Sequence, residues 1–340
     1  MRLLKPQLVI WWGFSKMPMS FGGVSKAKVA TIIVAADGTG DTTDIQTGIN
    51  ILPASGGVVY IKEGIYTIIA AIVIDSSNVS LRGAGYATEI KTASNIIMID
   101  LQGAVGLGQI TIDGIKLSGA GAGNDDNIGI KIRRMDNVSI YNTFIEETGG
   151  NGIDIDTLAT DNRIWKTKIM ESQNDGIRLG SSRATVLDSV LIVASERYGV
   201  FCDDTTLQTV LKSCSLYYNK DNQIHINSVS ECSIIGGFII EGEKHGIYIG
   251  SSGKIIVSNN IIKNNDYSNT ASYDGIFMES SDYCIITGNV FEGNDRYNLN
   301  VSDAGSDGNI LLGNQLNAAG CVGNINDLGT GTVNEHNVVI

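Results

Sequence analysis

The chain has 340 residues and a formal net charge of −12, with 43% hydrophobic and only 6% aromatic residues. So acidic a chain lacks the basic face that nucleic acids and anionic membrane surfaces require, and we expect neither as a partner. It holds only 3 prolines but 41 glycines, a composition typical of uninterrupted strands joined by tight turns.

An apolar stretch, Leu8 to Phe14, stands near the beginning of the chain. It is too short to span a membrane and has no small-residue cleavage site, so we predict neither a membrane span nor a signal peptide. Its aromatic side chains would be costly to leave in water, so we expect a partner to cover them. We therefore interpret residues 1–33 as an arm for attachment or oligomerisation, and 34–340 as one domain.

The segments that open this domain have a recognisable pattern. Residues 36–46 read Ala-Asp-Gly-Thr-Gly-Asp-Thr-Thr-Asp-Ile-Gln, 56–66 read Gly-Gly-Val-Val-Tyr-Ile-Lys-Glu-Gly-Ile-Tyr, and 79–85 read Val-Ser-Leu-Arg-Gly-Ala-Gly. This pattern resembles the opening of the pectate-lyase-like superfamily of right-handed β-helices, which includes pectate lyases, polygalacturonases and phage tailspike or appendage proteins. The resemblance implies a short helix near Thr43 to Leu52 that caps the open end of the solenoid.

A tetrad, Gly-apolar-x-apolar, recurs through the rest of the chain. It begins with Gly129-Ile130-Lys131-Ile132 and returns at steps of 23, 24, 23, 24, 23, 29 and 23 residues, with Gln or Asn replacing Gly twice. Alternation within the tetrad indicates a strand, and the fixed period indicates stacked coils. We predict an all-β protein: a right-handed, single-stranded parallel β-helix of about ten coils with a short N-terminal capping helix.

A second track runs in phase with the tetrads. Small polar residues follow the start of another short strand in almost every coil, which predicts a turn whose side chains stack into a hydrogen-bonded ladder. The positions are Thr143, Thr167, Ser189, Ser213, Gly237, Asn259, Asn289 and Asn314.

The third residue of each tetrad should point outward, and neighbours in successive coils should lie about 4.8 Å apart. Two residues further along each strand, a second column should place Asp156 and Asp203 about 10 Å apart across Gly180, which would leave room for a sugar. The first column consists of Asp100, Lys131, Asp154, Arg178, Phe201, His225, Tyr248, Phe277 and Asn300.

The middle of these columns is the candidate site. Asp154, Asp156, Asp203 and Arg178 are the catalytic candidates, because an inverting glycosidase needs two carboxyl groups about 6.5–9.5 Å apart. Two other interpretations remain open: sugar binding without cleavage, and an exposed ion-pair ladder without a ligand. The glycan-binding candidates, which offer rings or polar groups to a sugar, are Tyr198, Phe201, Asp204, His225, Tyr248 and Phe277.

No metal site and no cofactor are expected. The histidines are scattered, and the five cysteines form no CxxC pair, which indicates buried thiols. Calcium is the one ion that the carboxylates near Arg178, with Asp175 among them, would suit. Similarity to polygalacturonases is limited to the Asp203-Asp204 pair, since their other sequence blocks are absent.

The function that we predict is adhesion: a viral or phage appendage, similar to tailspikes, that binds cell-surface polysaccharide, with or without residual cleavage. Resemblance to such proteins implies a homotrimer at the virion surface or outside the cell, whose N-terminal arm docks on another virion or surface protein. The alternative is an extracellular enzyme similar to pectate lyases or polygalacturonases, which would be a polysaccharide lyase or inverting hydrolase. A structural surface protein without a small ligand is the third hypothesis.

Overall fold

Alternating apolar residues determine how this chain coils. The computed structural model describes residues 30–340 except 204–205, 269 and 318. Every second side chain of a strand points inward, as Ile130 and Ile153 do on two successive coils, and both are completely buried. The stacked inward residues form one continuous apolar core. The structure is therefore the parallel β-helix that the tetrads predicted.

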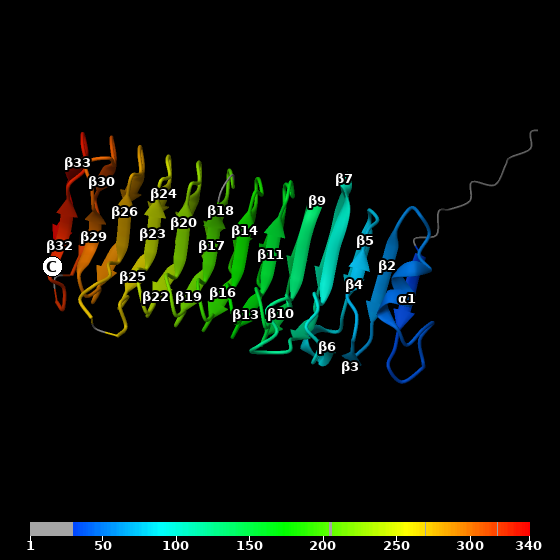
Figure 1. Cartoon of the computed structure of the whole chain (residues 1–340). Coiled ribbons are helices and arrows are strands. Elements are labelled where there is room, and N and C mark those ends of the chain that lie inside the picture. The colour runs from blue at the N-terminus through cyan, green and yellow to red at the C-terminus, as the bar shows by residue number, and fades with distance from the viewer. Residues whose placement is uncertain (1–29, 204–205, 269, 318) are drawn as a thin grey trace, which may run out of the picture.

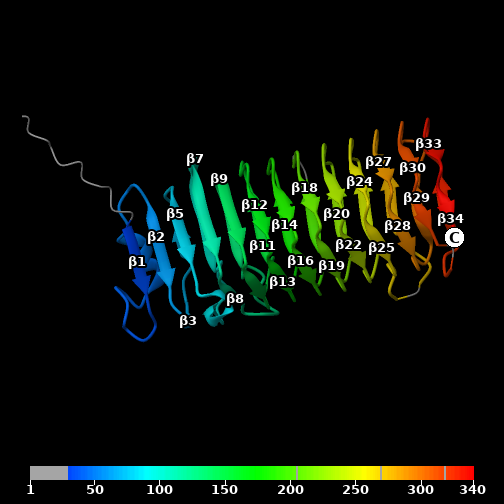
Figure 2. The same ribbon diagram turned by 180° about the vertical axis from the view of Figure 1, so that it is seen from behind.

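The strands lie in three rows along the solenoid, and each strand pairs in parallel with those of the neighbouring coils (Figures 1 and 2). The first row is β1 (Ala30–Val34), β2 (Gly57–Ile61), β5 (Val79–Arg82), the second part of β7 (Ile99–Asp113), the second part of β9 (Ile130–Tyr141), β12 (Arg163–Trp165), β15 (Val186–Asp188), β18 (Val210–Lys212), β21 (Ser233–Ile235), β24 (Ile256–Ser258), β27 (Ile285–Thr287), β30 (Ile310–Leu312) and β33 (Val333–Glu335).

The second row forms a sheet of its own. It consists of β3 (Gly64–Thr67), β6 (Thr88–Lys91), β8 (Lys116–Ser118), β10 (Phe144–Glu146), β13 (Lys168–Met170), β16 (Leu191–Val193), β19 (Ser215–Tyr217), β22 (Phe238–Ile240), β25 (Ile261–Lys263), β28 (Val290–Glu292), β31 (Gln315–Leu316) and β34 (Val338–Val339).

The third row carries the tetrads. It consists of β4 (Ile72–Ile74), the first parts of β7 and β9, β11 (Ile153–Asp156), β14 (Ile177–Gly180), β17 (Val200–Asp203), β20 (Ile224–Asn227), β23 (Ile247–Gly250), β26 (Ile276–Glu279), β29 (Tyr297–Val301) and β32 (Gly323–Asp327).

Glycine opens six of the eight tetrads, at corners where a side chain would be crowded. A Cβ atom at Gly199 would lie 2.6 Å from the carbonyl oxygen of Gln223 in the next coil and 2.7 Å from Leu216 Cδ2 in the core. The chain makes its corner here against its neighbour, and a larger residue would push the two coils apart.

Two details of the predicted fold are wrong. The solenoid has about 13 turns rather than ten, because the coils before Gly129 carry no tetrad from which to count. The structure also has no separate capping helix. A six-residue helix, α1 (Ile45–Asn50), is instead built into the first coil, where it contacts β1, β2 and β4. A short 3-10 turn, η1 (Gly85–Ala87), is the other helical element among the described residues.

The predicted arm, residues 1–33, lies outside the described residues except for 30–33, which belong to β1. These four residues of the predicted arm are therefore part of a solenoid strand. Within the described part of the chain, no helix is long and apolar enough to cross a bilayer.

The predicted polar ladder exists only in the C-terminal coils, and three of its predicted members lie one residue before the row. The misassigned residues are Ser189, Ser213 and Asn259, each of which has a positive φ. Parallel strand pairing places Val190, Cys214 and Asn260 in the row of Thr143 and Thr167 instead. The hydrogen-bonded ladder consists of Asn260, Asn289, Asn314 and Asn337.

Candidate functional site

The outward face of the third row, which we call the wall, has the stacking that the sequence predicted. Parallel pairing places Asp154 beside Arg178, Arg178 beside Phe201, and Phe201 beside His225. The pairing continues through Tyr248 and Phe277 to Asn300. Residues from Asp154 to Asn300, far apart in sequence, thus form one surface along the front of the solenoid in Figure 1.

Arg178 is the centre of the predicted catalytic group. Its guanidinium lies 2.9 Å from Asp203 Oδ2, 3.3 Å from Asp154 Oδ1 and 3.9 Å from Asp156 Oδ2. Burial alone would lower the pKa of Arg178, but the charges of Asp154 and Asp203 outweigh it and raise that pKa above its ordinary value. The structure therefore brings all four residues together around one cation.

Little space remains between these carboxylates. Asp154 is only 3% exposed and also contacts Lys131 Nζ at 3.0 Å. The gap expected above Gly180 is occupied, because a Cβ atom there would lie 2.9 Å from both Arg178 Nη2 and Asp203 Oδ1. The prediction of an open floor for a sugar at Gly180 is thus wrong: the arginine side chain folds back over the glycine.

The aromatic part of the wall is a stack of rings. His225 lies between Tyr198 and Tyr248, with ring centroids 4.4 and 4.3 Å away, and Phe277 continues the stack 5.6 Å beyond Tyr248. Arg197 covers Tyr198 at 4.8 Å from the ring centroid. The ring faces therefore pack on one another and on cations, and mainly ring edges and polar tips face outward.

The polar tips of this stack have fixed partners. The Asn222 side chain contacts His225 Nδ1 at 2.9 Å, and an Asn amide that donates to Nδ1 leaves the proton of a neutral ring on Nε2. Burial lowers the pKa of His225 to about 4. The Tyr248 hydroxyl donates to Glu279, and burial followed by this hydrogen bond raises the Tyr248 pKa. His225 and Tyr248 are thus neutral hydrogen-bonding groups of the ring stack near neutral pH.

Two arginine–aspartate ion pairs flank the ring stack, and sequence reasoning missed both. Arg197 donates from Nε to Asp175 at 2.7 Å, and Arg296 donates from Nε to Asp274 at 2.8 Å. Both aspartates are completely buried, and burial raises the Asp175 pKa although Arg197 opposes it. A repeated signal was present: Asp-Gly-Ile precedes Arg-Tyr by 22 residues in both cases.

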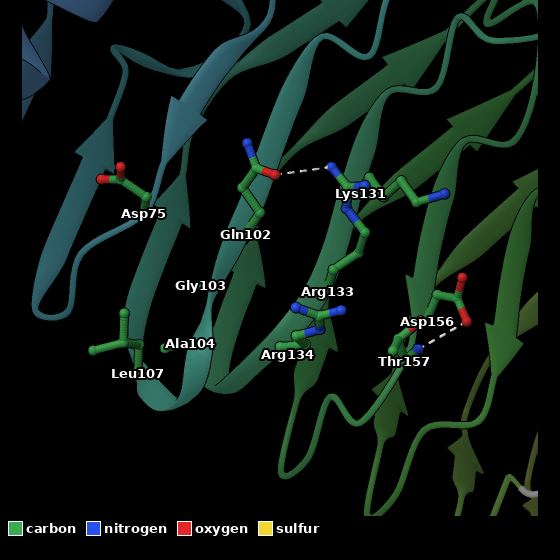
Figure 3. Close-up of a pocket in the computed structure, with 10 residues that line it drawn as sticks. All are labelled: Asp75, Gln102, Gly103, Ala104, Leu107, Lys131, Arg133, Arg134, Asp156 and Thr157. Atoms are coloured by element: carbon green, nitrogen blue, oxygen red, sulfur yellow. Dashed lines mark hydrogen bonds between the residues drawn. The ribbon is translucent and has the colours of Figure 1, made fainter.

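Asp204, a predicted glycan contact, lies outside the described residues. A pocket of about 720 Å³ opens at the N-terminal end of the wall, and sequence reasoning did not foresee it (Figure 3). Lys131 and Asp156 belong both to the wall and to this pocket. Gln102 of β7 and Arg134 of β9 line it as well. Sequence reasoning missed Gln102 because β7 has no tetrad, and it missed Arg134 because this residue follows the two outward columns.

Fold and wall together define the class: a right-handed parallel β-helix of the pectate-lyase-like type with a polar and aromatic outward face. A sequence model of one family, described as "Periplasmic copper-binding protein (NosD)", matches residues 160–332, half of the chain. The chain belongs to this family. No curated protein sequence matches it significantly.

Solved structures share the fold at low sequence identity. The A-module of the mannuronan C-5 epimerase AlgE6 of Azotobacter vinelandii superposes with a TM-score of 0.72 at 17% identity, covering 87% of this chain and 94% of that chain. ORF18 of Geobacillus virus E2 gives 0.63 at 16% identity, covering 91% and 60%. Tailspike protein 2 of an Escherichia coli O157:H7 bacteriophage gives 0.59 at 16% identity, covering 73% and 35%.

Proposed function

We propose that this protein binds a polysaccharide chain along the wall and does not cleave it. The observation that carries the proposal is the continuous column of outward side chains from Asp100 to Asn300, in parallel register on every coil. The rise per coil, about 4.8 Å, is close to the length of one sugar unit in an extended chain. Successive coils would therefore offer contacts at the spacing of successive sugars.

Binding is favoured over cleavage by the packing around the carboxylates. An inverting hydrolase needs a water-filled gap between its two carboxyl groups. Here the Arg178 guanidinium contacts both Asp156 and Asp203 and fills the gap between them. We therefore assign Asp154, Asp156, Asp203 and Arg178 to shaping the wall. His225, Tyr248 and the edges of Tyr198, Phe201 and Phe277 are the proposed glycan contacts.

The finer proposal is an appendage of the tailspike type, outside the cytoplasm and assembled as a homotrimer. Its support is that ORF18 of a Geobacillus virus and a phage tailspike protein share the fold. The alginate epimerase among the solved relatives supports the broader proposal of a carbohydrate ligand. The apolar segment Leu8 to Phe14, proposed to dock on a partner, lies outside the described residues.

Copper, named in the description of the family, does not fit the residues at hand. Within the described part of the chain no three or more His, Cys, Asp and Glu side chains gather so that they could hold a metal ion. Burial raises the pKa of Cys214 to about 11 and that of Cys232 to about 12, so these interior thiols keep their protons, whereas a metal binds the thiolate. We therefore do not propose copper binding.

The test is binding to an array of bacterial cell-surface polysaccharides, followed by affinity measurements on each bound glycan. Tyr248→Phe removes one hydroxyl from the wall and keeps the stacked ring, and we expect it to weaken binding about five- to tenfold, as for one lost hydrogen bond. Tyr217→Phe makes the same change on the second row, in β19, and should leave affinity unchanged.

Equal loss in both variants, or no bound glycan, would contradict binding at the wall. Product release should be absent for every bound glycan. Release that disappears in Asp156→Asn or Asp203→Asn would replace the binding proposal by catalysis at Arg178.

A further inference from the structure

The pocket at the N-terminal end of the wall arises from an irregularity in β7. Gln102 pairs with Arg133 of β9, and the next pair is Leu107 with Met135, so four residues of β7 stand opposite a single residue, Arg134. The extra residues leave the sheet and form a rim, seen beside Gly103 and Ala104 in Figure 3. The rim encloses the pocket of about 720 Å³.

Cations are concentrated in this pocket although the chain is strongly acidic. Lys131, Arg133 and Arg134 line it against two carboxylates, Asp75 and Asp156. Lys131 reaches away to Asp154 at 3.0 Å, and Arg133 is held by Asp100 at 2.5 Å and Gln102 at 3.3 Å.

Arg134 differs from the other two cations. It is exposed, and among the described residues its guanidinium forms no ion pair or side-chain hydrogen bond. Its backbone is fixed at a left-handed corner, φ 56°, where its N–H donates to the Thr157 carbonyl at 3.0 Å. The backbone thus presents an uncompensated planar donor to a pocket that is large enough for a sugar unit.

We propose that this pocket binds a sugar unit that carries an oxyanion, with the anionic group on Arg134 and the sugar hydroxyls on Asp75 and Asp156. The guanidinium matches carboxylate, sulfate and phosphate oxygens through paired donors, and the carboxylates accept from hydroxyl groups. The inference deepens the proposed function, because the pocket continues the wall and would select polysaccharides with charged units. The pocket itself is testable with monosaccharides alone.

The experiment is saturation-transfer NMR of D-glucuronate and of D-glucose with the full chain, at equal ionic strength. We expect D-glucuronate to bind and D-glucose to bind at least about tenfold more weakly, the difference expected for one charge-assisted contact. Arg134→Gln should abolish this preference. Arg183→Gln is the matched control, because Arg183 is likewise exposed and lies in an isolated bridge outside the pocket.

A second variant tests whether the pocket itself, and not only the charge of Arg134, is needed for binding. Ala104→Phe fills the pocket from its exposed rim, keeps all charges, and should remove D-glucuronate binding. Inorganic sulfate is the competitor. If sulfate displaces D-glucuronate, the site binds oxyanions in general; if it does not, the site is specific for the sugar carboxylate. D-glucuronate that binds wild type and Arg134→Gln equally would overturn the inference. If neutral glycans bind on the array but D-glucuronate does not bind, the inference about the pocket is overturned and the proposed function is retained.

Discussion

His245 shows how one side chain can replace another in the repeat. It precedes a third-row strand, and its Nδ1 accepts the backbone N–H of Asp274 in the next coil at 3.0 Å. Asn222 has the same role one coil earlier, where its Oδ1 accepts the His245 N–H at 3.0 Å. Burial, followed by the charge of Arg296, lowers the His245 pKa to about 3. The neutral ring is therefore part of the folded structure.

This geometry predicts acid sensitivity. An unfolded histidine titrates near pH 6.5, so the unfolded state binds more protons than the folded state between about pH 6.5 and pH 3, and stability falls as the pH falls through that window. His245→Asn keeps an acceptor and removes the titration. We expect its melting temperature to drop less than that of wild type between about pH 7 and pH 4, by circular dichroism.

His225, with a pKa of about 4, remains in this variant, so part of the wild-type decline should persist. His336 is the control, since its side chain is 77% exposed, and His336→Asn should follow the wild-type curve. Identical acid slopes for wild type and His245→Asn would show that His245 does not control the decline.

At the scale of single elements, sequence reasoning succeeded where a glycine marked the start of a strand. The tetrads fixed the register of the third row, and with it the pairing of Asp154 with Arg178. The prediction of the ladder positions failed where two apolar residues open a strand, as Val186 and Leu187 do. Either residue fits the inward position of the repeat, and only the pairing of Leu187 with the buried Ile164 shows that Leu187 points inward. The ring stack was not predictable, because rotamers depend on neighbours from other coils.

The corrected ladder makes a prediction about the first-row corner. Asn289 accepts from Asn260 N and Nδ2 at 2.9 and 3.0 Å, and donates to the Val257 carbonyl at 2.8 Å and to Asn314 Oδ1 at 3.1 Å. Because all of these groups are buried, Asn289→Ala leaves several without partners, and we expect a loss of about 2–4 kcal/mol in the free energy of unfolding.

Asn259 is the matched control, one residue before the ladder member Asn260. It is exposed, with φ 57°, so Asn259→Gly suits its backbone and should change stability by less than about 1 kcal/mol. Chemical denaturation of the two variants and wild type gives the comparison. A larger loss in Asn259→Gly would return the ladder to the position that the sequence first indicated.

At the scale of the whole molecule, stability should vary along the solenoid, because each coil contacts only its neighbours. The middle strand β20 pairs on both sides, with β17 and β23. Within the described part of the chain, β32, β33 and β34 pair on one side only, with β29, β30 and β31. Val333, Val338 and Val339 are about half exposed. We predict that backbone amides of residues 323–339 exchange with deuterium at least about a hundredfold faster than those of residues 224–240, which corresponds to roughly 3 kcal/mol lower local stability.

Mass spectrometry of peptides from the intact chain measures both regions in one sample, and the second region serves as the internal reference. Equal protection would mean that another molecule, such as a second copy of the chain, covers this end of the sheet. Repeating the exchange at lower protein concentration would then separate the two explanations, because protection by a second copy is lost on dilution while protection within one chain is not.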